Sequence, residues 1–145
     1  MDAVKTKNTT ELLRDLKKSA HFSDFVRKNE KSLRHDDFTR SFTRLFEQQG
    51  RSKAEIARAA GTSEAYLYQI ISGHRTPSRN RLLCICIGIH TPVDEAQALL
   101  KQCGHAPLSA REKRDAAILY GLIHGLTLNE VNDSLFECGE LSLME

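Results

Sequence analysis

The clearest signals in this sequence are the residues that begin and end helices. A Ser or Thr followed three residues later by an acid caps the free N–H groups of a helix start and is capped in return. This pattern occurs as Ser52 with Glu55, Ser109 with Glu112, and Thr127 with Glu130. Thr76-Pro77 and Thr91-Pro92 predict two further starts, and glycines at 50, 61, 73, 104, 125 and 139 supply the ends. Strand signals are nearly absent, so we expect an all-α fold.

The spacing of these signals predicts helices at 9–19, 23–31, 36–49, 52–60, 63–72, 77–89, 92–103, 110–124 and 127–138. In the third of these, apolar residues recur at helical spacing and predict a core-facing side made of Phe38, Phe42, Leu45 and Phe46. The run LLCICIGI at 82–89 is rich in β-branched residues, but Thr-Pro starts on both sides of it favour a buried helix. We also assign Tyr120 to the core.

The last third of the chain contains an internal repeat with an offset of 35 residues. VDEAQALLKQCGHAPL at 93–108 aligns with LNEVNDSLFECGELSL at 128–143, and the helices that precede the two copies fall into register as well. Two stacked helical hairpins would produce this pattern, and so would a chance similarity of amphipathic helices. For the whole chain we predict an N-terminal helical arm at 1–34, a central domain at 35–108 and a C-terminal helical hairpin at 109–145.

Charge is distributed unevenly along a chain whose net charge is only +2. Residues 1–35 and 50–81 each carry a net charge of +4, residues 36–49 carry −1, and residues 82–145 carry −5. Such a chain can turn a basic face toward a polyanion and an acidic end away from it. No apolar run approaches about 18 residues, and the polar start lacks the apolar segment of a secretory signal. We therefore expect a cytoplasmic protein without a membrane span.

The cysteines do not have the spacing of a metal site. Cys84, Cys86, Cys103 and Cys138 contain no C-x-x-C pair, and His105 adds no H-x-x-x-H pair. We expect reduced thiols that serve as small buried apolar side chains, with no metal and no cofactor. The histidines likewise lack a nucleophile or second carboxylate at a catalytic spacing, so we do not expect an enzyme.

The stretch GRSKAEIARAAGTSEAYLYQIISGHRTPSR, which begins at residue 50, has the pattern of two short helices that cross closely. The first helix needs a small residue where the second passes over it, and Ala57 fills that position. One helical turn later, Gly61 can turn the chain. The apolar residues that lock the two helices together are Ile56, Ala60, Leu67 and Ile70.

This stretch resembles the helix-turn-helix of the Cro/C1-type repressors, also called the XRE family. The resemblance covers about 38–100 and includes the run GTSEAYLYQIISGHRTPS, in which a Ser starts the second helix, a Gly ends it and a basic loop with Pro follows. It implies a five-helix domain, flanked here by the N-terminal helical arm and the C-terminal helical hairpin. It also implies a regulator of transcription that binds double-stranded DNA.

In that family the second helix of the motif lies in the major groove of DNA. Carried over to this sequence, the resemblance implies base contacts from Glu64, Ala65, Tyr68 and Gln69. Gln69 can form a bidentate contact with adenine, Glu64 can accept from cytosine, and Ala65 can pack on a thymine methyl group. Phosphate contacts, helped by helix-start N–H groups at the two serines, are expected from Arg51, Ser52, Lys53, Ser63, His74, Arg75 and Arg79.

Two functions are compatible with these patterns. The first is a sequence-specific transcriptional regulator, in particular a homodimeric repressor at a near-palindromic operator. The second is a helix-turn-helix scaffold that binds a protein partner, such as an antitoxin or a phage-defence adaptor, with weak or no DNA binding. We expect the C-terminal hairpin to be available to such a partner. The dimer is expected to form through apolar residues after residue 90, namely Val93, Leu99, Leu100, Leu122, Val131 and Leu135.

Overall fold

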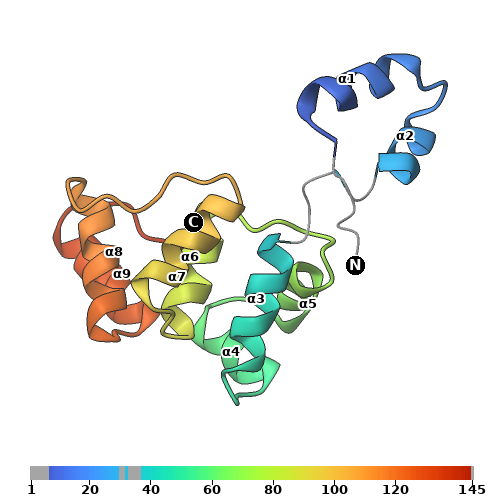
Figure 1. Cartoon of the computed structure of the whole chain (residues 1–145). Coiled ribbons are helices and arrows are strands. Elements are labelled where there is room, and N and C mark those ends of the chain that lie inside the picture. The colour runs from blue at the N-terminus through green and yellow to red at the C-terminus, as the bar shows by residue number, and fades with distance from the viewer. Residues whose placement is uncertain (1–6, 30–31, 33–36, 145) are drawn as a thin grey trace. The chain divides into compact units, whose positions relative to one another are not determined.

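The computed structural model describes residues 7–29, 32 and 37–144, and the regular elements in this part of the chain are all helices (Figure 1). They are α1 (Thr9–Lys18), α2 (Phe22–Asn29), α3 (Asp37–Glu47), α4 (Lys53–Ala59), α5 (Glu64–Ile71), α6 (Arg79–Gly88), α7 (Val93–Gln102), α8 (Lys113–His124) and α9 (Leu128–Glu137). The predicted all-α fold is therefore confirmed. The chain divides into two compact units, residues 1–35 and 36–145, whereas the predicted division into three parts stays a prediction.

The N-terminal unit contains α1 and α2 and is held together by a polar cluster around Lys7. α1 has no buried residue, and its Leu13 and Leu16 are largely exposed. Lys7 Nζ donates to the amide oxygen of the buried Asn29 (2.7 Å) and pairs with Asp15. The hydrogen bond from Lys7 holds the pKa of Asp15 below its ordinary value. This unit thus keeps an exposed leucine face on α1.

Side-chain caps begin several helices of residues 37–144, as the sequence predicts. The box at Thr127 is complete, because its hydroxyl accepts from the Glu130 N–H (3.2 Å) and a Glu130 carboxylate oxygen accepts from the Thr127 N–H (3.1 Å). Ser52 Oγ accepts from the Glu55 N–H (3.1 Å) at the start of α4. These local signals therefore place both helix starts within one residue.

Two helices begin two or three residues later than the capping signals predict. Ser109 does not form the predicted box with Glu112, because its Oγ accepts from the Arg111 N–H (3.3 Å) and its own N–H donates to the buried Asp115 carboxylate (3.0 Å), and α8 begins only at Lys113. The helix expected to start at Pro77 begins at Arg79, because Ser78 caps it. In both places a contact or a nearer capping residue outcompetes the pattern read from the sequence.

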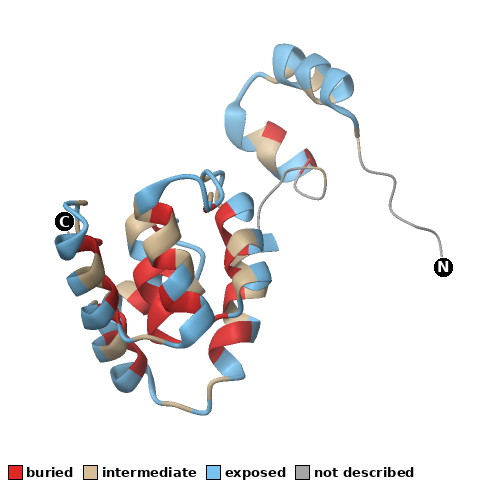
Figure 2. Cartoon of the chain, turned by 90° about the vertical axis from the view of Figure 1, so that its left-hand side faces the viewer, coloured by how far each residue is buried: buried red, intermediate tan, exposed pale blue. Residues whose placement is uncertain are grey.

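A continuous apolar core joins α3 to α9, and Figure 2 shows the buried parts of these ribbons facing the inside of the unit. Phe42, Leu45 and Phe46 of α3 are buried as predicted, and Phe38 is half-buried against them. All residues at 82–89 are buried, which confirms the buried helix expected there. Burying one aliphatic side chain contributes about 1.5–3 kcal/mol. Because α6 is buried at every residue from Leu82 to Gly88, it is the central element of the core.

The helices α6 and α7 lie between α3–α5 on one side and α8–α9 on the other (Figure 1). α4 approaches α6 so closely that a Cβ on Gly88 would lie 2.9 Å from backbone atoms of Ala59 and Ala60. On the far side, a Cβ on Gly121 of α8 would overlap the Val131 side chain of α9. Glycines therefore permit close helix packing in both halves of this unit.

The hairpins α6–α7 and α8–α9 contain the same hydrogen bonds at positions 35 residues apart. After α7, Gln97 Oε1 accepts from the Leu108 N–H (2.7 Å). After α9, Asn132 Oδ1 accepts from the Leu143 N–H (3.0 Å). A chance similarity of amphipathic helices does not require matched contacts of this kind, so the repeat predicted from the sequence is confirmed as a structural duplication.

The turns inside the two hairpins are also equivalent. His90 adopts a left-handed conformation (φ +53°) after α6, and Gly125 does the same (φ +64°) after α8. The N–H of the next residue donates to a carbonyl five positions back in each case, from Thr91 and from Leu126 (both 2.9 Å). The unusual φ of a non-glycine residue at position 90 is therefore explained as the helix-ending position of the repeat.

Two arginines at equivalent positions bind the hairpins to each other. Arg79 and Arg114 each donate to two carbonyl groups in the loop after their own hairpin, again at matching positions. Arg79 also pairs with the Asp115 carboxylate (3.1 Å), and Arg114 donates to the Asn80 amide oxygen (3.2 Å). Because Asn80 and Asp115 are themselves equivalent positions, the contacts are exchanged as they would be across a two-fold axis. The two hairpins are pseudo-symmetric copies packed on each other.

Some side chains lie elsewhere than the sequence suggested. Tyr120 is 57% exposed and does not belong to the core. Cys84 and Cys86 are buried as expected, and burial raises their pKa values to about 11 and about 12. Cys138 is exposed and Cys103 is half-buried, so the expectation of buried thiols is wrong for these two.

The apolar residues expected to form a dimer surface belong to the core of the chain itself. Val93 is half-buried, and the others are at most 8% exposed: Leu99, Leu100, Leu122, Val131 and Leu135. These faces are buried by packing within the chain itself, so this basis for the dimer is wrong. The exposed large apolar residues after residue 90 are Tyr120, Ile123, Phe136, Leu141 and Met144.

Candidate nucleic-acid interface

The helices α4 and α5 form a helix-turn-helix around a left-handed glycine. Gly61 has φ +64°, a left-handed conformation that disfavours any residue with a side chain, and the flexible end of Met144 lies over the turn, with its Cε 2.8 Å from where a Cβ would stand. Ser63 Oγ then accepts from the Tyr66 N–H (3.1 Å) and begins α5. The predicted inner positions are all at most 4% exposed: Ile56, Ala57, Ala60, Leu67 and Ile70.

The residues predicted to contact bases lie together on the solvent side of α5. They are Glu64, Ala65, Tyr68 and Gln69, and all are exposed. Leu67 and Ile70 on the opposite side are 0% exposed, and their burial fixes the rotation of the helix about its axis. The structure thus presents one polar face of α5 to a ligand, while its contacts with bases stay a prediction.

Cations lie beside the two tyrosines of α5. Lys53 Nζ, from the start of α4, is 5.5 Å from the centre of the Tyr68 ring. The guanidinium groups of Arg75 and Arg81 are 5.5 Å and 5.3 Å from the centre of the Tyr66 ring. Sequence reasoning missed Arg81, because only the tertiary structure brings this residue of α6 beside Tyr66 of α5.

The hydroxyl and imidazole members of the predicted phosphate set are exposed and locally bonded. Ser52 and Ser63 cap α4 and α5, so their side-chain oxygens are already acceptors for backbone N–H groups. His74 Nδ1 lies 2.7 Å from Ser72 Oγ in the loop after α5. Ser52 and Ser63 thus stand at the starts of the two helices of the motif and His74 in the loop after α5, while their contacts with phosphates stay a prediction.

Two arginines of the predicted phosphate set make contacts within the protein. Arg51 donates to the Gly88 carbonyl (2.8 Å) and so links the start of α4 to the end of α6. Arg79 has a side chain only 25% exposed and pairs with Asp115. The repeat could have indicated this role, because Arg114 stands 35 positions later in the second hairpin.

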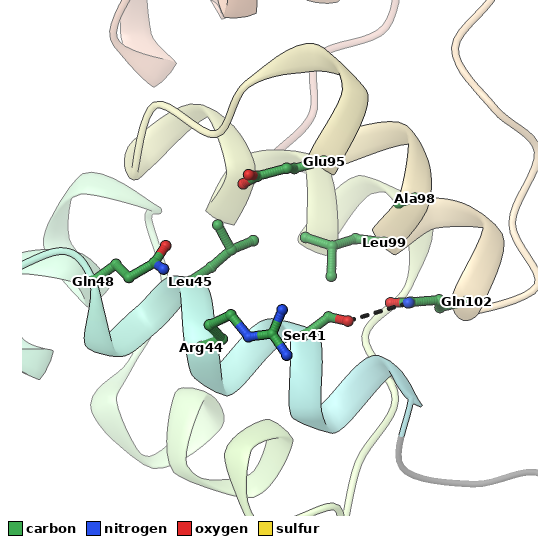
Figure 3. Close-up of a pocket in the computed structure, with 8 residues that line it drawn as sticks. All are labelled: Ser41, Arg44, Leu45, Gln48, Glu95, Ala98, Leu99 and Gln102. Atoms are coloured by element: carbon green, nitrogen blue, oxygen red, sulfur yellow. Dashed lines mark hydrogen bonds between the residues drawn. The ribbon is translucent and has the colours of Figure 1, made fainter.

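A shallow groove of about 280 Å³ runs between α3 and α7 (Figure 3). Its lining residues are Ser41, Arg44, Leu45 and Gln48 of α3, with Glu95, Ala98, Leu99 and Gln102 of α7. In Figure 3 the Leu45 and Leu99 side chains extend into the space between the two helices. Arg44 and Glu95 stand on opposite walls, and neither forms an ion pair with another described residue. No pattern in the sequence predicts this groove, because its walls come from helices about 50 residues apart in the chain.

Within residues 7–29, 32 and 37–144, no group of three or more His, Cys, Asp or Glu side chains is placed to hold a metal ion. None of the helices there has both the length and the apolar character needed to cross a membrane.

The fold and the exposed face of α5 define a helix-turn-helix domain. A family model described as helix-turn-helix matches residues 44–103, from within α3 to the end of α7. This segment is therefore a helix-turn-helix of the Cro/C1 type, and the match supports a DNA-binding helix-turn-helix regulator. The match spans about two fifths of the chain, and α1, α2, α8 and α9 lie outside it. No curated protein and no solved structure gives a significant match to the chain.

Proposed function

We propose that the protein is a sequence-specific DNA-binding regulator that inserts the exposed face of α5 into the major groove. The observation that carries this proposal is the position of Glu64, Ala65, Tyr68 and Gln69 on one exposed face of a helix whose inner face is fully buried. That face lies inside the segment matched by the helix-turn-helix family. Its amide, carboxylate and methyl groups are suited to the edges of adenine, cytosine and thymine. The activity that we propose is binding, without catalysis.

Phosphate contacts in this proposal come from the exposed cations around α5. Lys53 and Arg75 flank the helix and are exposed. Arg79 is left out, because its guanidinium group is engaged by Asp115 and by carbonyl groups of its own loop. Arg51 can contribute through the part of its guanidinium group that Gly88 does not engage.

Selection of bound duplexes from a random DNA library tests the proposal directly. The expected result is an enriched motif whose binding weakens with salt, because binding to phosphates releases counterions. Changing Lys53 and Arg75 together to Ala should weaken binding to all duplexes and lower the salt slope by about two. The matched control, Lys101 and Arg111 changed to Ala, removes the same charge from exposed positions outside the site. Equal losses in the two double variants would contradict the assignment.

The specificity of α5 is tested separately at Gln69. Truncating Gln69 to Ala should cost about 1–3 kcal/mol on the selected duplex and much less on random DNA, without a change in salt slope. Leu67→Asp serves as the comparison, because it buries a charge and should abolish folding of the motif and every activity together. The ratio of specific to non-specific dissociation constants decides the question. A ratio that Gln69→Ala leaves unchanged would remove Gln69 as a base reader.

We further propose that the regulator is a cytoplasmic homodimeric repressor whose contact surface is the groove between α3 and α7. In a two-fold interface, if one residue of the first copy contacts a second residue of the other copy, the same two residues also form the contact with the copies exchanged. Arg44 and Glu95 stand on opposite walls and form no ion pair with another described residue, so they are able to pair with each other across such an axis. Sedimentation should show a dimer for the wild type, monomers for Arg44→Glu and Glu95→Arg, and a dimer again for the double variant. A wild-type monomer at micromolar concentration rules this dimer out.

The alternative is a helix-turn-helix scaffold for a protein partner, as in an antitoxin or a phage-defence adaptor. The exposed apolar side chains of Tyr120 and Ile123 on α8 favour a partner surface in the C-terminal hairpin. The duplex selection separates the two functions. If the selection yields no duplex that binds in a salt-dependent way, the scaffold becomes the supported function and the regulator is ruled out.

A further inference from the structure

The second hairpin exposes the surface that the first hairpin buries against the helix-turn-helix. On α6, Ile85 is 1% exposed and Gly88 lies under the backbone of α4. The equivalent residues on α8, 35 positions later, are Tyr120 and Ile123, which are 57% and 65% exposed. In the unit of residues 36–145, α8 and α9 lie on the side of α6–α7 that faces away from α3–α5 (Figure 1). The duplication thus repeats the hairpin without repeating the helices that cover it.

The equivalent of the α3-facing side of α7 is acidic in the second hairpin. Three residues of α7 that line the groove with α3 are Glu95, Ala98 and Gln102. Their equivalents on α9 are Glu130, Asp133 and Glu137, which are all exposed acids at helical spacing. Glu130 also caps the start of α9 through Thr127, and its carboxylate remains solvent-accessible.

We infer that this surface binds a basic amphipathic helix of a partner protein. The surface consists of an apolar strip on α8, made of Tyr120 and Ile123, and of an acidic row on α9, made of Glu130, Asp133 and Glu137. The first hairpin shows a helix on the equivalent face, because α4 lies over Gly88 of α6. Ile123 at that position of α8 would hold a partner helix farther from the α8 backbone and offer it an exposed apolar side chain. The apolar strip is complementary to the apolar side of such a helix. The three carboxylates are complementary to Lys and Arg on its flank, and they disfavour an acidic partner. This site is separate from α5 and from the groove between α3 and α7.

Two designed helical peptides of about 18 residues provide the probe, because that length allows several turns. They share one apolar side of Leu and Ala, and their polar sides carry Lys in one peptide and Glu in the other. Fluorescence anisotropy with the full chain should show saturable binding of the Lys peptide, at least about tenfold tighter than binding of the Glu peptide. The binding should weaken as salt screens the exposed carboxylates. Amide NMR shifts should change in α8 and α9.

Variants of the full chain locate the binding. Ile123→Ser should weaken the Lys peptide about tenfold while circular dichroism stays unchanged, since Ile123 is 65% exposed. Asp133→Lys with Glu137→Lys should reverse the preference in favour of the Glu peptide. The matched control, Glu47→Lys with Asp94→Lys, makes the same change of charge at exposed positions on α3 and α7 and should leave the preference unchanged.

Three outcomes would overturn the inference. The first is the absence of saturable binding by the Lys peptide. The second is an equal effect of the control and the α9 charge reversals, which would show attraction by net charge alone. The third is a wild-type dimer that Ile123→Ser converts to a monomer and Arg44→Glu does not, which would make a second copy of the chain the occupant. None of these results depends on whether the protein binds DNA.

Discussion

The two hairpins of the duplication have the same backbone and different surroundings. In both, an arginine at the start of the first helix binds the loop after the second helix, and an amide side chain accepts from the same loop. The first hairpin is covered on both sides, by the helix-turn-helix and by its copy (Figure 1). The second is covered on one side only, and its other side keeps exposed apolar residues. The duplicated contacts therefore define the hairpin, whereas the residues that differ define what each copy meets.

The residues that differ between the two hairpins lie where the two copies have different neighbours. Where α4 approaches α6 the first copy has Gly88, and the second copy has Ile123 at the same position. Where the copies contact each other, the pair of equivalent residues is Asn80 and Asp115, one neutral and one charged. The pseudo-two-fold contact is thus symmetric in geometry and asymmetric in charge. Four pairs of substitutions test this comparison.

The largest difference in stability is expected between the buried face of α6 and the equivalent exposed face of α8. Ile85→Ala removes a side chain that is 1% exposed and should lower the free energy of unfolding by about 3–4 kcal/mol through lost burial and a cavity. Tyr120→Ala, at the equivalent but 57% exposed position, should change it by less than about 0.5 kcal/mol. Urea unfolding of both variants measures the difference. Similar losses would mean that the second strip is covered after all.

The next difference concerns the arginines that join the copies. Arg79→Ala leaves the Asp115 carboxylate, whose side chain is 12% exposed, without its cation and should cost about 2–3 kcal/mol. Arg114→Ala leaves a neutral amide and two carbonyl groups and should cost about 1 kcal/mol. In an Asp115→Asn background the additional cost of Arg79→Ala should fall to that of Arg114→Ala. Thermal unfolding of the four variants would refute the charge asymmetry if the two arginine losses were equal from the start.

A smaller effect is expected where glycine allows α4 to approach. Gly88→Ala places a Cβ 2.9 Å from the backbone of Ala59 and Ala60, and this overlap should outweigh the gain in helix propensity by about 1–2 kcal/mol. Ile123→Ala at the equivalent exposed position should change stability by less than about 0.5 kcal/mol. Denaturant midpoints at a constant m value test both. A stabilising Gly88→Ala would show that the two helices can separate without cost.

The smallest effects should be the same in both hairpins. Gln97→Ala and Asn132→Ala each remove the acceptor of one loop N–H, that of Leu108 and that of Leu143. Because both leucines are buried, each loss should cost about 1 kcal/mol, and the two values should agree within a few tenths. Amide hydrogen exchange at Leu108 and Leu143 provides the direct readout, since each N–H should lose protection only in its own variant.

Local sequence signals predicted the helices and the inner face of the motif because these depend on neighbouring residues. Capping at Ser52 and Thr127 involves residues three positions apart. The burial of Leu67 and Ile70 follows from helical spacing and a turn at Gly61, so the exposed face of α5 could be predicted as its complement. The repeat was also visible, because duplicated contacts preserve residue types at a fixed offset.

The sequence by itself thus determined the all-α class, the helix-turn-helix and the paired hairpins. Only the tertiary structure decided which surfaces are consumed by packing. It engaged Arg79 with Asp115, placed Met144 against the turn at Gly61 and left Tyr120 exposed. The first two contacts join residues far apart in the chain, and the exposure of Tyr120 results from the absence of a covering helix. Hydrophobic periodicity predicts which face of a helix is apolar, but it does not predict which element packs against that face.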